Sequence, residues 1–144
     1  MSCLSAHNIT YVWSPAGDKG SNQYWPGERF VDWVGMSIFE FPAFDQAYYH
    51  QPTRSFHDQM TEKYGRLCIY RKPILITEWG VTGSTEYQLS WLSDALRDLR
   101  NYPLVRVLIY FNAKDTPGAW GKDYTTPDWR ISGYGLMRVI GAPL

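Results

Sequence analysis

The chain has 144 residues, 44% of them hydrophobic, and its 14 basic side chains balance its 14 acidic ones. This length suits one domain over residues 1–144, and the aromatic share of 17% argues against disorder. A net charge of zero argues against nucleic acid as a partner. A membrane span needs about 18 consecutive apolar residues, and no run in the sequence approaches that length, so we expect no membrane partner either.

Four segments have the composition of β-strands, namely residues 8–13, 30–39, 73–77 and 104–111. The last two are nearly continuous apolar runs. Such runs are typical of strands that are covered on both faces, as in the parallel sheets of α/β proteins.

Two segments carry helix signals. Ser55 is a predicted N-cap for a helix that reaches about Tyr64, with Gly65 in the stop position. The second helix is predicted to follow Thr85, because residues 85–88 have the form of a capping box. Its leucines recur at helical spacing, and the proline after Tyr102 ends it: Leu89, Leu92, Leu96, Leu99 and Pro103.

The alternation of strands and helices predicts a parallel sheet with right-handed crossovers. The long loops 15–29 and 113–132 are rich in turn residues, and each follows the carboxyl end of a predicted strand. In α/β barrels the active site is built from loops at that end. We therefore expect an α/β fold with its site there.

Aromatic residues are abundant, with 7 Trp, 11 Tyr and 6 Phe. One interpretation is a core rich in aromatic residues. The other is that several rings face a sugar, whose C–H groups pack on an aromatic ring while its hydroxyls need polar neighbours. Composition leaves both interpretations open.

The two cysteines, Cys3 and Cys68, have neither a CxxC spacing nor a histidine at metal-ligand spacing. We expect buried free thiols rather than a disulfide. The sequence predicts no metal and no cofactor.

Glu78 directly follows the predicted strand 73–77. Because side chains alternate along a strand, Ile74, Ile76 and Glu78 are predicted to share one face. If that face points into a barrel, the Glu78 carboxylate emerges at the mouth, where it can act as a nucleophile toward a sugar carbon. The alternative is a structural glutamate that accepts hydrogen bonds from nearby backbone.

The order of short motifs along the chain resembles the C-terminal half of a glycoside hydrolase of family 26, the β-mannanase type. The matching segments are 13–15, 24–27, 31–35, 72–80, 110–112 and 128–131. The resemblance implies the fifth to eighth strands of a TIM (β/α)8 barrel, four βα units, with Glu78 as the nucleophile of a retaining enzyme. The length agrees, because such a barrel takes about 250 residues.

Two departures from the family pattern stand out. The acid/base glutamate of the family lies in a His-Glu-Met-Asn-like motif after the fourth strand, and this sequence has no such motif. Glu40 and Asp115 are weak substitutes, because neither stands where the family places its acid. In addition, Phe39 stands where many members have a tyrosine that orients the nucleophile.

Five residues are predicted to line the substrate site beside Glu78: Trp13, Phe39, Trp79, Asn112 and Trp120. Each tryptophan has packing as its alternative, and Trp79 has the further alternative of pointing away from Glu78. Trp120 is the favoured sugar platform. Asn112 either binds sugar hydroxyls or caps a turn.

The resemblance thus predicts a glycosidase acting on a β-linked polysaccharide such as mannan, with the acid/base missing from this chain. The alternatives are a non-catalytic carbohydrate-binding half-barrel and a structural relic. Because half a barrel leaves open sheet edges, we expect a missing N-terminal half, a homodimer of half-barrels or collapse into a more compact α/β arrangement. Relatives of this type are commonly extracellular or periplasmic, although the first ten residues show no signal peptide.

Overall fold

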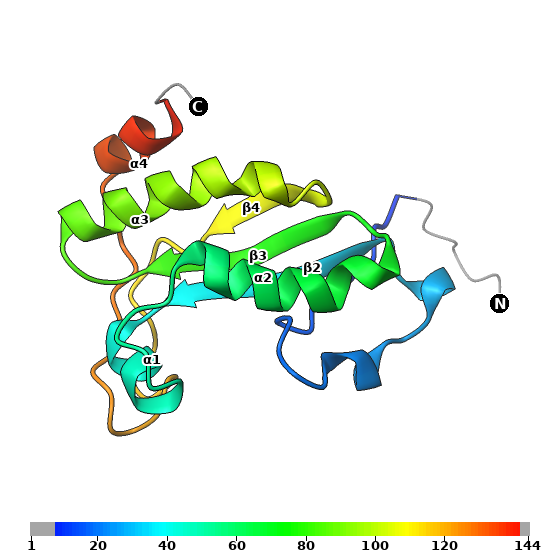
Figure 1. Cartoon of the computed structure of the whole chain (residues 1–144), viewed down its shortest axis with the longest axis horizontal. Helices are drawn as coiled ribbons and strands as arrows, with labels where there is room; N and C mark the ends of the chain where they lie inside the picture. The colour runs from blue at the N-terminus through cyan, green and yellow to red at the C-terminus, as the bar shows by residue number, and fades with distance from the viewer. Residues whose placement is uncertain (1–7, 142–144) are drawn as a thin grey trace, which may run out of the picture.

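The computed structural model describes residues 8–141. Four strands form one sheet in the order β1-β2-β3-β4, and every neighbouring pair is parallel. The strands are β1 (Val12–Trp13), β2 (Trp33–Glu40), β3 (Ile74–Val81) and β4 (Val105–Tyr110), drawn in Figure 1. A sequential parallel order is the arrangement of four consecutive βα units of a barrel, so the predicted α/β half-barrel is confirmed.

The strand β1 is shorter than the predicted segment 8–13. It pairs only with β2, through Val12 and Trp13. Before it, the Tyr11 amide donates to a carboxylate oxygen of Asp32 at 2.8 Å instead of to a strand. An edge strand can form backbone hydrogen bonds with one neighbouring strand only, so fewer such bonds are present to lengthen it.

Four helices accompany the sheet: α1 (Pro42–Tyr48), α2 (Phe56–Leu67), α3 (Thr85–Asp98) and α4 (Gly133–Ile140). Single 3₁₀ turns cover Ser21–Tyr24, Glu28–Phe30, Cys68–Tyr70 and Leu99–Asn101. The prediction lacked α1 and α4. Within the described part of the chain, no helix is both long and apolar enough to cross a membrane.

The helix ends correct two predictions. Ser55 caps α2 as predicted, in a capping box with Asp58, but α2 continues through Gly65 because Leu67 packs into the core with 1% exposed. The N-cap of α3 is Ser84, whose hydroxyl accepts from the Tyr87 amide at 3.3 Å. Thr85 is therefore the first helical residue and not the cap.

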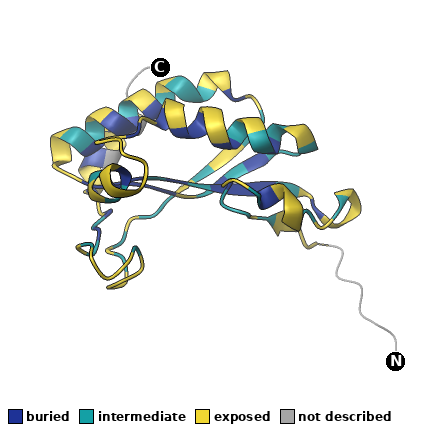
Figure 2. Cartoon of the chain, turned by 60° about the horizontal axis from the view of Figure 1, so that its bottom comes forward, coloured by how far each residue is buried: buried dark blue, intermediate teal, exposed yellow. Residues whose placement is uncertain are grey.

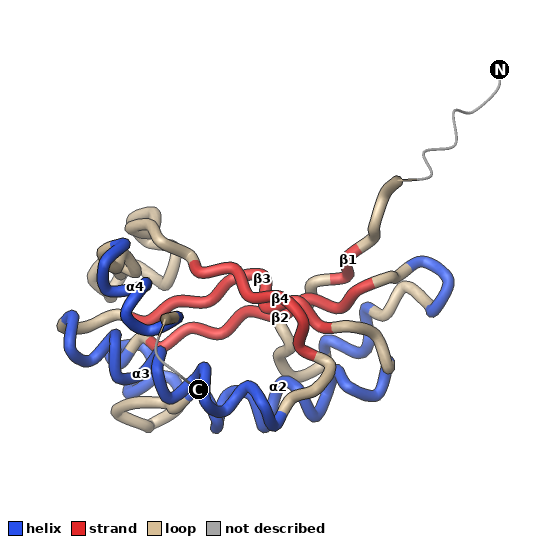
Figure 3. The backbone as a smooth tube through the Cα atoms, turned by 90° about the horizontal axis from the view of Figure 1, so that it is seen from above, coloured by secondary structure: helices blue, strands red, loops and turns tan. Residues whose placement is uncertain are grey.

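The helices α2 and α3 lie along one side of the sheet (Figure 3). Their buried and exposed residues alternate, with the buried ones toward the sheet (Figure 2). Aliphatic side chains of β2 and β3 meet them there and are fully buried: Val34, Met36, Ile38, Ile74 and Ile76. Each such side chain contributes about 1.5–3 kcal/mol through burial.

The opposite side of the sheet carries no helix from the crossovers, and we call it the open face. On β4, Val107 and Ile109 point to this face and are 41% and 51% exposed. Leu108 and Tyr110 alternate with them and pack on the core. The open face is therefore partly apolar and in contact with solvent.

A bulge in β3 decides which side chains reach the open face. The strand pairs Met36 with Ile76 and then Ser37 with Glu78, so Thr77 is an extra residue. Ile74 and Ile76 lie under the helices, and beyond the bulge Trp79 does too. The prediction that Ile74, Ile76 and Glu78 share a face is therefore wrong, because the bulge shifts the alternation by one residue and turns Glu78 to the open face.

Cys3 lies outside the described residues, so the prediction for the cysteine pair stays open. Cys68 is a free cysteine and is half-buried. Its thiol contacts the Gly65 carbonyl oxygen at 3.7 Å.

Candidate active site

A cavity of about 970 Å³ lies at the carboxyl ends of the strands. Ser37, Phe39 and Glu78 of the sheet line its floor, and α1 adds Phe44 and Tyr48. In Figure 1 the strand arrows point toward α1 and the loop 113–132, which lie together at this end of the sheet. The cavity stands where α/β barrels place their sites.

Glu78 is the exposed carboxylate of this floor. Its Oε2 atom accepts a hydrogen bond from the Ser37 hydroxyl at 3.1 Å. Its strand β3 lies between β2 and β4, and Glu78 itself pairs with Ser37 of β2, while the ladder with β4 is interrupted between Ile76 and Trp79. A rigid strand therefore presents a carboxylate to the cavity, and a neighbouring hydroxyl orients it.

Ser37 was missed in the sequence. A serine in an otherwise apolar strand carries no signal by itself. Only the register of β2 and β3, which pairs Ser37 with Glu78, makes the hydrogen bond evident. Ser37 supplies the hydroxyl that Phe39 cannot offer.

A second pair of polar side chains, Ser14 and Thr77, lies on the open face, and Thr77 directly precedes Glu78 in β3. The hydroxyls of Ser14 and Thr77 are 3.2 Å apart. A side chain at Gly35 would meet both, since a Cβ built there lies 2.5 Å from the Ser14 hydroxyl oxygen and 2.8 Å from a Thr77 methyl. Glycine at position 35 thus allows β1 and β3 to place these side chains over β2.

Phe39 lines the cavity and belongs to an aromatic cluster with Phe41, Phe44, Trp120 and Trp129, while its predicted contact with substrate stays a prediction. Its ring centroid is 4.7 Å from that of Trp129. Gly80 makes room for this packing, because a Cβ there would lie 3.0 Å from both rings. The glycine after Glu78 and Trp79 is therefore needed for the close approach of rings to the strand.

Trp120 is brought to the cavity from the loop 113–132. Its ring packs edge-on against Phe44 at 5.0 Å, and its indole N–H donates to Asp115 at 2.9 Å. The Trp129 indole donates to the same carboxylate oxygen at 3.2 Å. Asp115 is thus an anchor for the cluster. Burial raises its pKa, but the hydrogen bonds from the Trp120 indole, the Thr116 amide and the Trp129 indole together outweigh burial and leave the pKa below the ordinary value.

Trp79 is not at the cavity. It is 5% exposed and lies under the helices, with ring centroids 6.0 Å from Phe56 and 6.2 Å from Trp91. The prediction that Trp79 lines the substrate site is wrong, because neighbouring side chains of a strand point to opposite faces and Glu78 is on the open face. Its role is packing.

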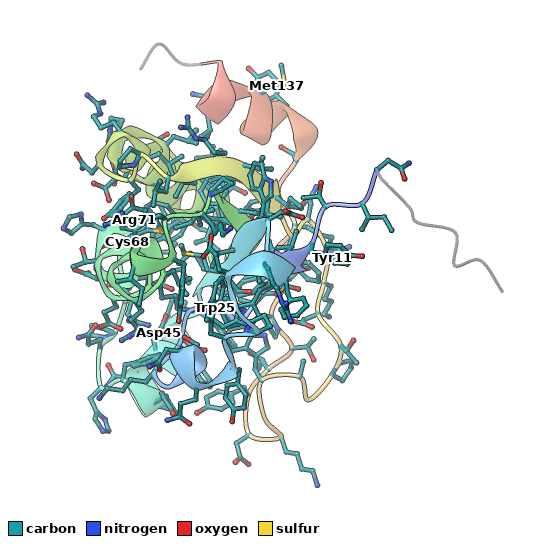
Figure 4. All side chains as sticks on the ribbon, turned by 90° about the vertical axis from the view of Figure 1, so that its right-hand side faces the viewer. Tyr11, Trp25, Asp45, Cys68, Arg71 and Met137 are labelled. Carbon is teal, nitrogen blue, oxygen red and sulfur yellow. The ribbon has the colours of Figure 1, made fainter. Side chains whose placement is uncertain are left out.

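Trp13 and Asn112 also lie away from the cavity lining. Trp13 packs against Trp25 and Tyr70, at 4.9 Å and 5.3 Å, and Trp25 is labelled in Figure 4. The Asn112 side-chain oxygen accepts from the Ile131 amide at 2.8 Å, so it ties down the end of the loop 113–132. Both predicted substrate contacts are corrected to structural roles.

Glu40 is unsuited to act on a ligand in the cavity. It is fully buried, accepts from the Tyr87 hydroxyl and the Arg54 amide at 2.9 Å each, and does not line the cavity. Burial raises its pKa to about 7. Asp115, the other weak candidate, is held by the two indoles and lines no part of the cavity either.

The other carboxylates of the cavity lining are engaged. Asp18 pairs with Lys63 at 3.1 Å, and Glu62 pairs with Arg54 at 3.3 Å. Asp45 of α1, labelled in Figure 4, is 3% exposed and accepts from the Phe41 amide. Among the described residues, Glu78 is thus the exposed lining carboxylate that forms no ion pair, with the Ser37 hydroxyl as its hydrogen-bond donor. Among residues 8–141, no group of three or more His, Cys, Asp or Glu side chains is placed to hold a metal ion.

Comparison with known proteins gives structural similarity only. No family model and no curated protein sequence matches the chain. A solved structure of a GH128 (subgroup I) endo-β-1,3-glucanase from Amycolatopsis mediterranei with laminaritriose is 20% identical, with a TM-score of 0.43, and the match covers 78% of this chain and 46% of that chain. For a variant of that enzyme with laminarihexaose the identity and TM-score are 20% and 0.43, and the coverages are 76% and 45%. This chain spans about half the length of those solved chains. Similarity of this extent does not assign it to a family.

Proposed function

We propose that the chain is the nucleophile-bearing part of a retaining glycoside hydrolase that acts on a β-linked polysaccharide. One observation carries the proposal: an exposed carboxylate, Glu78, lies in the carboxyl-terminal half of a central parallel strand and lines a cavity that also has aromatic rings in its wall. A nucleophile for a sugar carbon needs this combination of rigidity and access.

In the proposed step, a Glu78 carboxylate oxygen attacks the anomeric carbon of the bound sugar. The bond from that carbon to the glycosidic oxygen breaks, and the electron pair leaves with that oxygen. The product is a sugar ester of Glu78, which water later hydrolyses. The Ser37 hydroxyl, 3.1 Å from Oε2, keeps one oxygen in place so that the other faces the sugar.

The aromatic lining supports a sugar as the ligand. Phe39, Phe44, Tyr48 and Trp120 contribute ring surface to a cavity that also holds charged and hydroxyl side chains. A pyranose needs both kinds of contact, since its C–H face packs on rings and its hydroxyls need donors and acceptors. A cavity of about 970 Å³ accommodates more than one sugar unit.

The acid/base is proposed to come from a segment that covers the open face. A retaining enzyme needs a second carboxyl group about 5 Å from the nucleophile. Among the described residues, the other carboxylates of the lining are ion-paired or buried. The solvent exposure of Val107 and Ile109 supports the open face as the surface on which such a segment packs. A further four strands, or a second copy of the chain, is the expected partner.

The test uses substrates that need no acid. Dinitrophenyl β-glycosides have such a good leaving group that attack by Glu78 alone releases dinitrophenolate. With the 2-deoxy-2-fluoro analogue we expect a covalent adduct, which peptide mass spectrometry places on Glu78. Glu78→Ala should release no dinitrophenolate and form no adduct. An adduct on another residue, or equal release by Glu78→Ala, would refute the assignment.

Comparing mannoside with glucoside identifies the substrate. The resemblance to family 26 enzymes supports mannan, so we expect the mannoside to be the better substrate. Preference for the glucoside would replace mannan with a β-glucan and leave the proposed chemistry intact.

A second candidate function is a non-catalytic carbohydrate-binding half-barrel, favoured by the aromatic lining together with the lack of a second free carboxylate in it. It predicts oligosaccharide binding that Glu78→Gln leaves unchanged, with no release of dinitrophenolate. Calorimetric titration with mannohexaose and laminarihexaose separates the two functions.

A further inference from the structure

Lys63 of α2 is a buried cation that contacts Ser37, the residue whose hydroxyl supports the candidate nucleophile Glu78. Its side chain is 11% exposed, and its ammonium group has three partners. It donates to the Ser37 carbonyl oxygen at 2.8 Å and to the Ala16 carbonyl oxygen at 3.1 Å, and it pairs with Asp18 at 3.1 Å. These contacts use all three N–H groups that an ammonium offers.

The two carbonyl groups belong to the parts that shape the site. Ser37 is the residue whose hydroxyl donates to Glu78. Ala16 begins the cavity wall that also includes Asp18 and Lys19. The Ser37 amide donates to the Ala16 carbonyl oxygen at 3.3 Å, so the wall and the floor are joined directly above Lys63.

The backbone around Lys63 is held in an uncommon conformation. Ala16 has a φ of 59° and Gly17 a φ of 84°, both in the left-handed region. A Cβ at Gly17 would lie 3.0 Å from the Lys63 Cβ atom, so the loop fits closely around this side chain. A non-glycine residue keeps such a conformation only where its surroundings impose it.

Burial of the Lys63 ammonium group costs solvation free energy, which other interactions must offset. Burial lowers the pKa of Lys63, and the Asp18 carboxylate opposes that change. A methionine would fill the same space without this cost. In return, the ammonium group holds the carbonyl groups of Ala16 and Ser37 in fixed positions.

We propose that Lys63 is a positioning residue: it fixes the Ser37 segment of β2, and through the Ser37 hydroxyl it holds Glu78 in the orientation for attack. The proposal rests on the proposed function of Glu78. Lys63 also lines the cavity, but in this role it contacts Ser37 and not Glu78. It acts through Ser37.

A double-mutant cycle on the whole chain tests this role. The rate of dinitrophenolate release at saturating dinitrophenyl β-glycoside is measured for wild type, Lys63→Met, Ser37→Ala and the double variant. We expect each single variant to lose about tenfold in kcat, the effect of one hydrogen bond to a charged group. The double variant should lose about as much as one single variant, because both act on the same bond.

Lys72→Met is the matched control. Lys72 also binds the β1–β2 loop, through Glu28, but it does not line the cavity. It should keep wild-type kcat. If circular dichroism shows that Lys63→Met is unfolded, Lys63→Gln takes its place in the cycle.

The outcomes separate the two proposals. A wild-type chain that releases no dinitrophenolate refutes the proposed function, and the role of Lys63 falls with it. If the wild type is active but Lys63→Met keeps its kcat within twofold, only the role of Lys63 is refuted. Losses that multiply to about a hundredfold in the double variant would also refute it, because Lys63 would then act independently of Ser37.

Discussion

The two faces of the sheet are made by the same strands but bury different side chains. Under α2 and α3 lie aliphatic residues such as Ile38 and Ile76, both fully buried. The open face carries Ser37, Thr77 and Glu78, which bond to one another or to Ser14. The comparison teaches that stability and chemistry are divided between the faces, so substitutions on each should have separable effects.

The largest effect is expected on the helix-covered face. Ile76→Ala removes fully buried methyl groups and should lower the free energy of unfolding by about 2–5 kcal/mol. Ile109→Ala is the matched control on the open face, where the side chain is 51% exposed, and should cost less than about 1 kcal/mol. Urea unfolding followed by circular dichroism measures both. Equal losses would show that the open face is covered in solution.

The next effect concerns Glu40, the carboxylate on the covered face. Because its pKa in the folded chain is about 7 and its ordinary value is 4.5, the folded chain binds the proton more tightly. Stability should therefore fall as the pH rises from about 4.5 to about 7, by roughly 3 kcal/mol, and this contribution should then level off. Urea unfolding across this pH range measures the slope.

The groups that face Glu40 are Tyr87 from α3, Asp45 from α1 and Arg54 from the turn before α2. Burial raises the pKa of Asp45 as well, so its contribution has the same sign. Glu40→Gln should remove most of the slope. A slope that Glu40→Gln leaves intact would assign the titration to another group.

A smaller effect is expected for the cavity wall. Trp120→Ala removes a ring that lines the cavity, and it should weaken binding of a mannooligosaccharide or laminarioligosaccharide about tenfold, near 1.4 kcal/mol. Trp25→Ala removes a ring that packs on Trp13 and Tyr70 and should leave the affinity unchanged. Calorimetric titration of the folded variants decides between them. Equal losses would place the sugar elsewhere.

The smallest effect is expected for Val107→Thr on the open face. The side chain is 41% exposed, so the change should alter stability by less than about 0.5 kcal/mol. Thermal unfolding at two protein concentrations measures it. A larger loss that depends on concentration would reveal a second copy packed on this face.

Most of the fold could be predicted because its signals are local. The apolar run 73–77 and the leucines of α3 each carry a period or a composition typical of their element. The helices α1 and α4 gave weaker signals. The first has 7 residues and begins with Phe41-Pro42, and the second contains two glycines and leaves Met137 exposed (Figure 4).

The candidate site was predictable only in part. Glu78 was singled out because a carboxylate directly after a buried strand is unusual, and it lines one cavity with Phe39 and Trp120, while their roles toward a substrate stay predictions. Ser37 and Lys63 were missed because their contacts depend on strand register and on a helix that packs beside the loop. The face of Glu78 relative to Ile74 and Ile76 was wrong because a bulge cannot be seen in a pattern of alternating residues, whereas alternation alone already places Trp79 opposite Glu78.

That bulge has a consequence for how this segment tolerates change. Substitutions at Thr77 alter one side chain, but deletion of that residue would restore simple alternation along the strand. Glu78 would then stay on the open face and Trp79 beneath the crossover helices, because the ladder with β2 already passes over the extra residue. The contact between the Thr77 and Ser14 hydroxyls would be lost. A shortened strand should therefore keep its acidic group in water, whereas a full-length strand forced to lie flat would bury it.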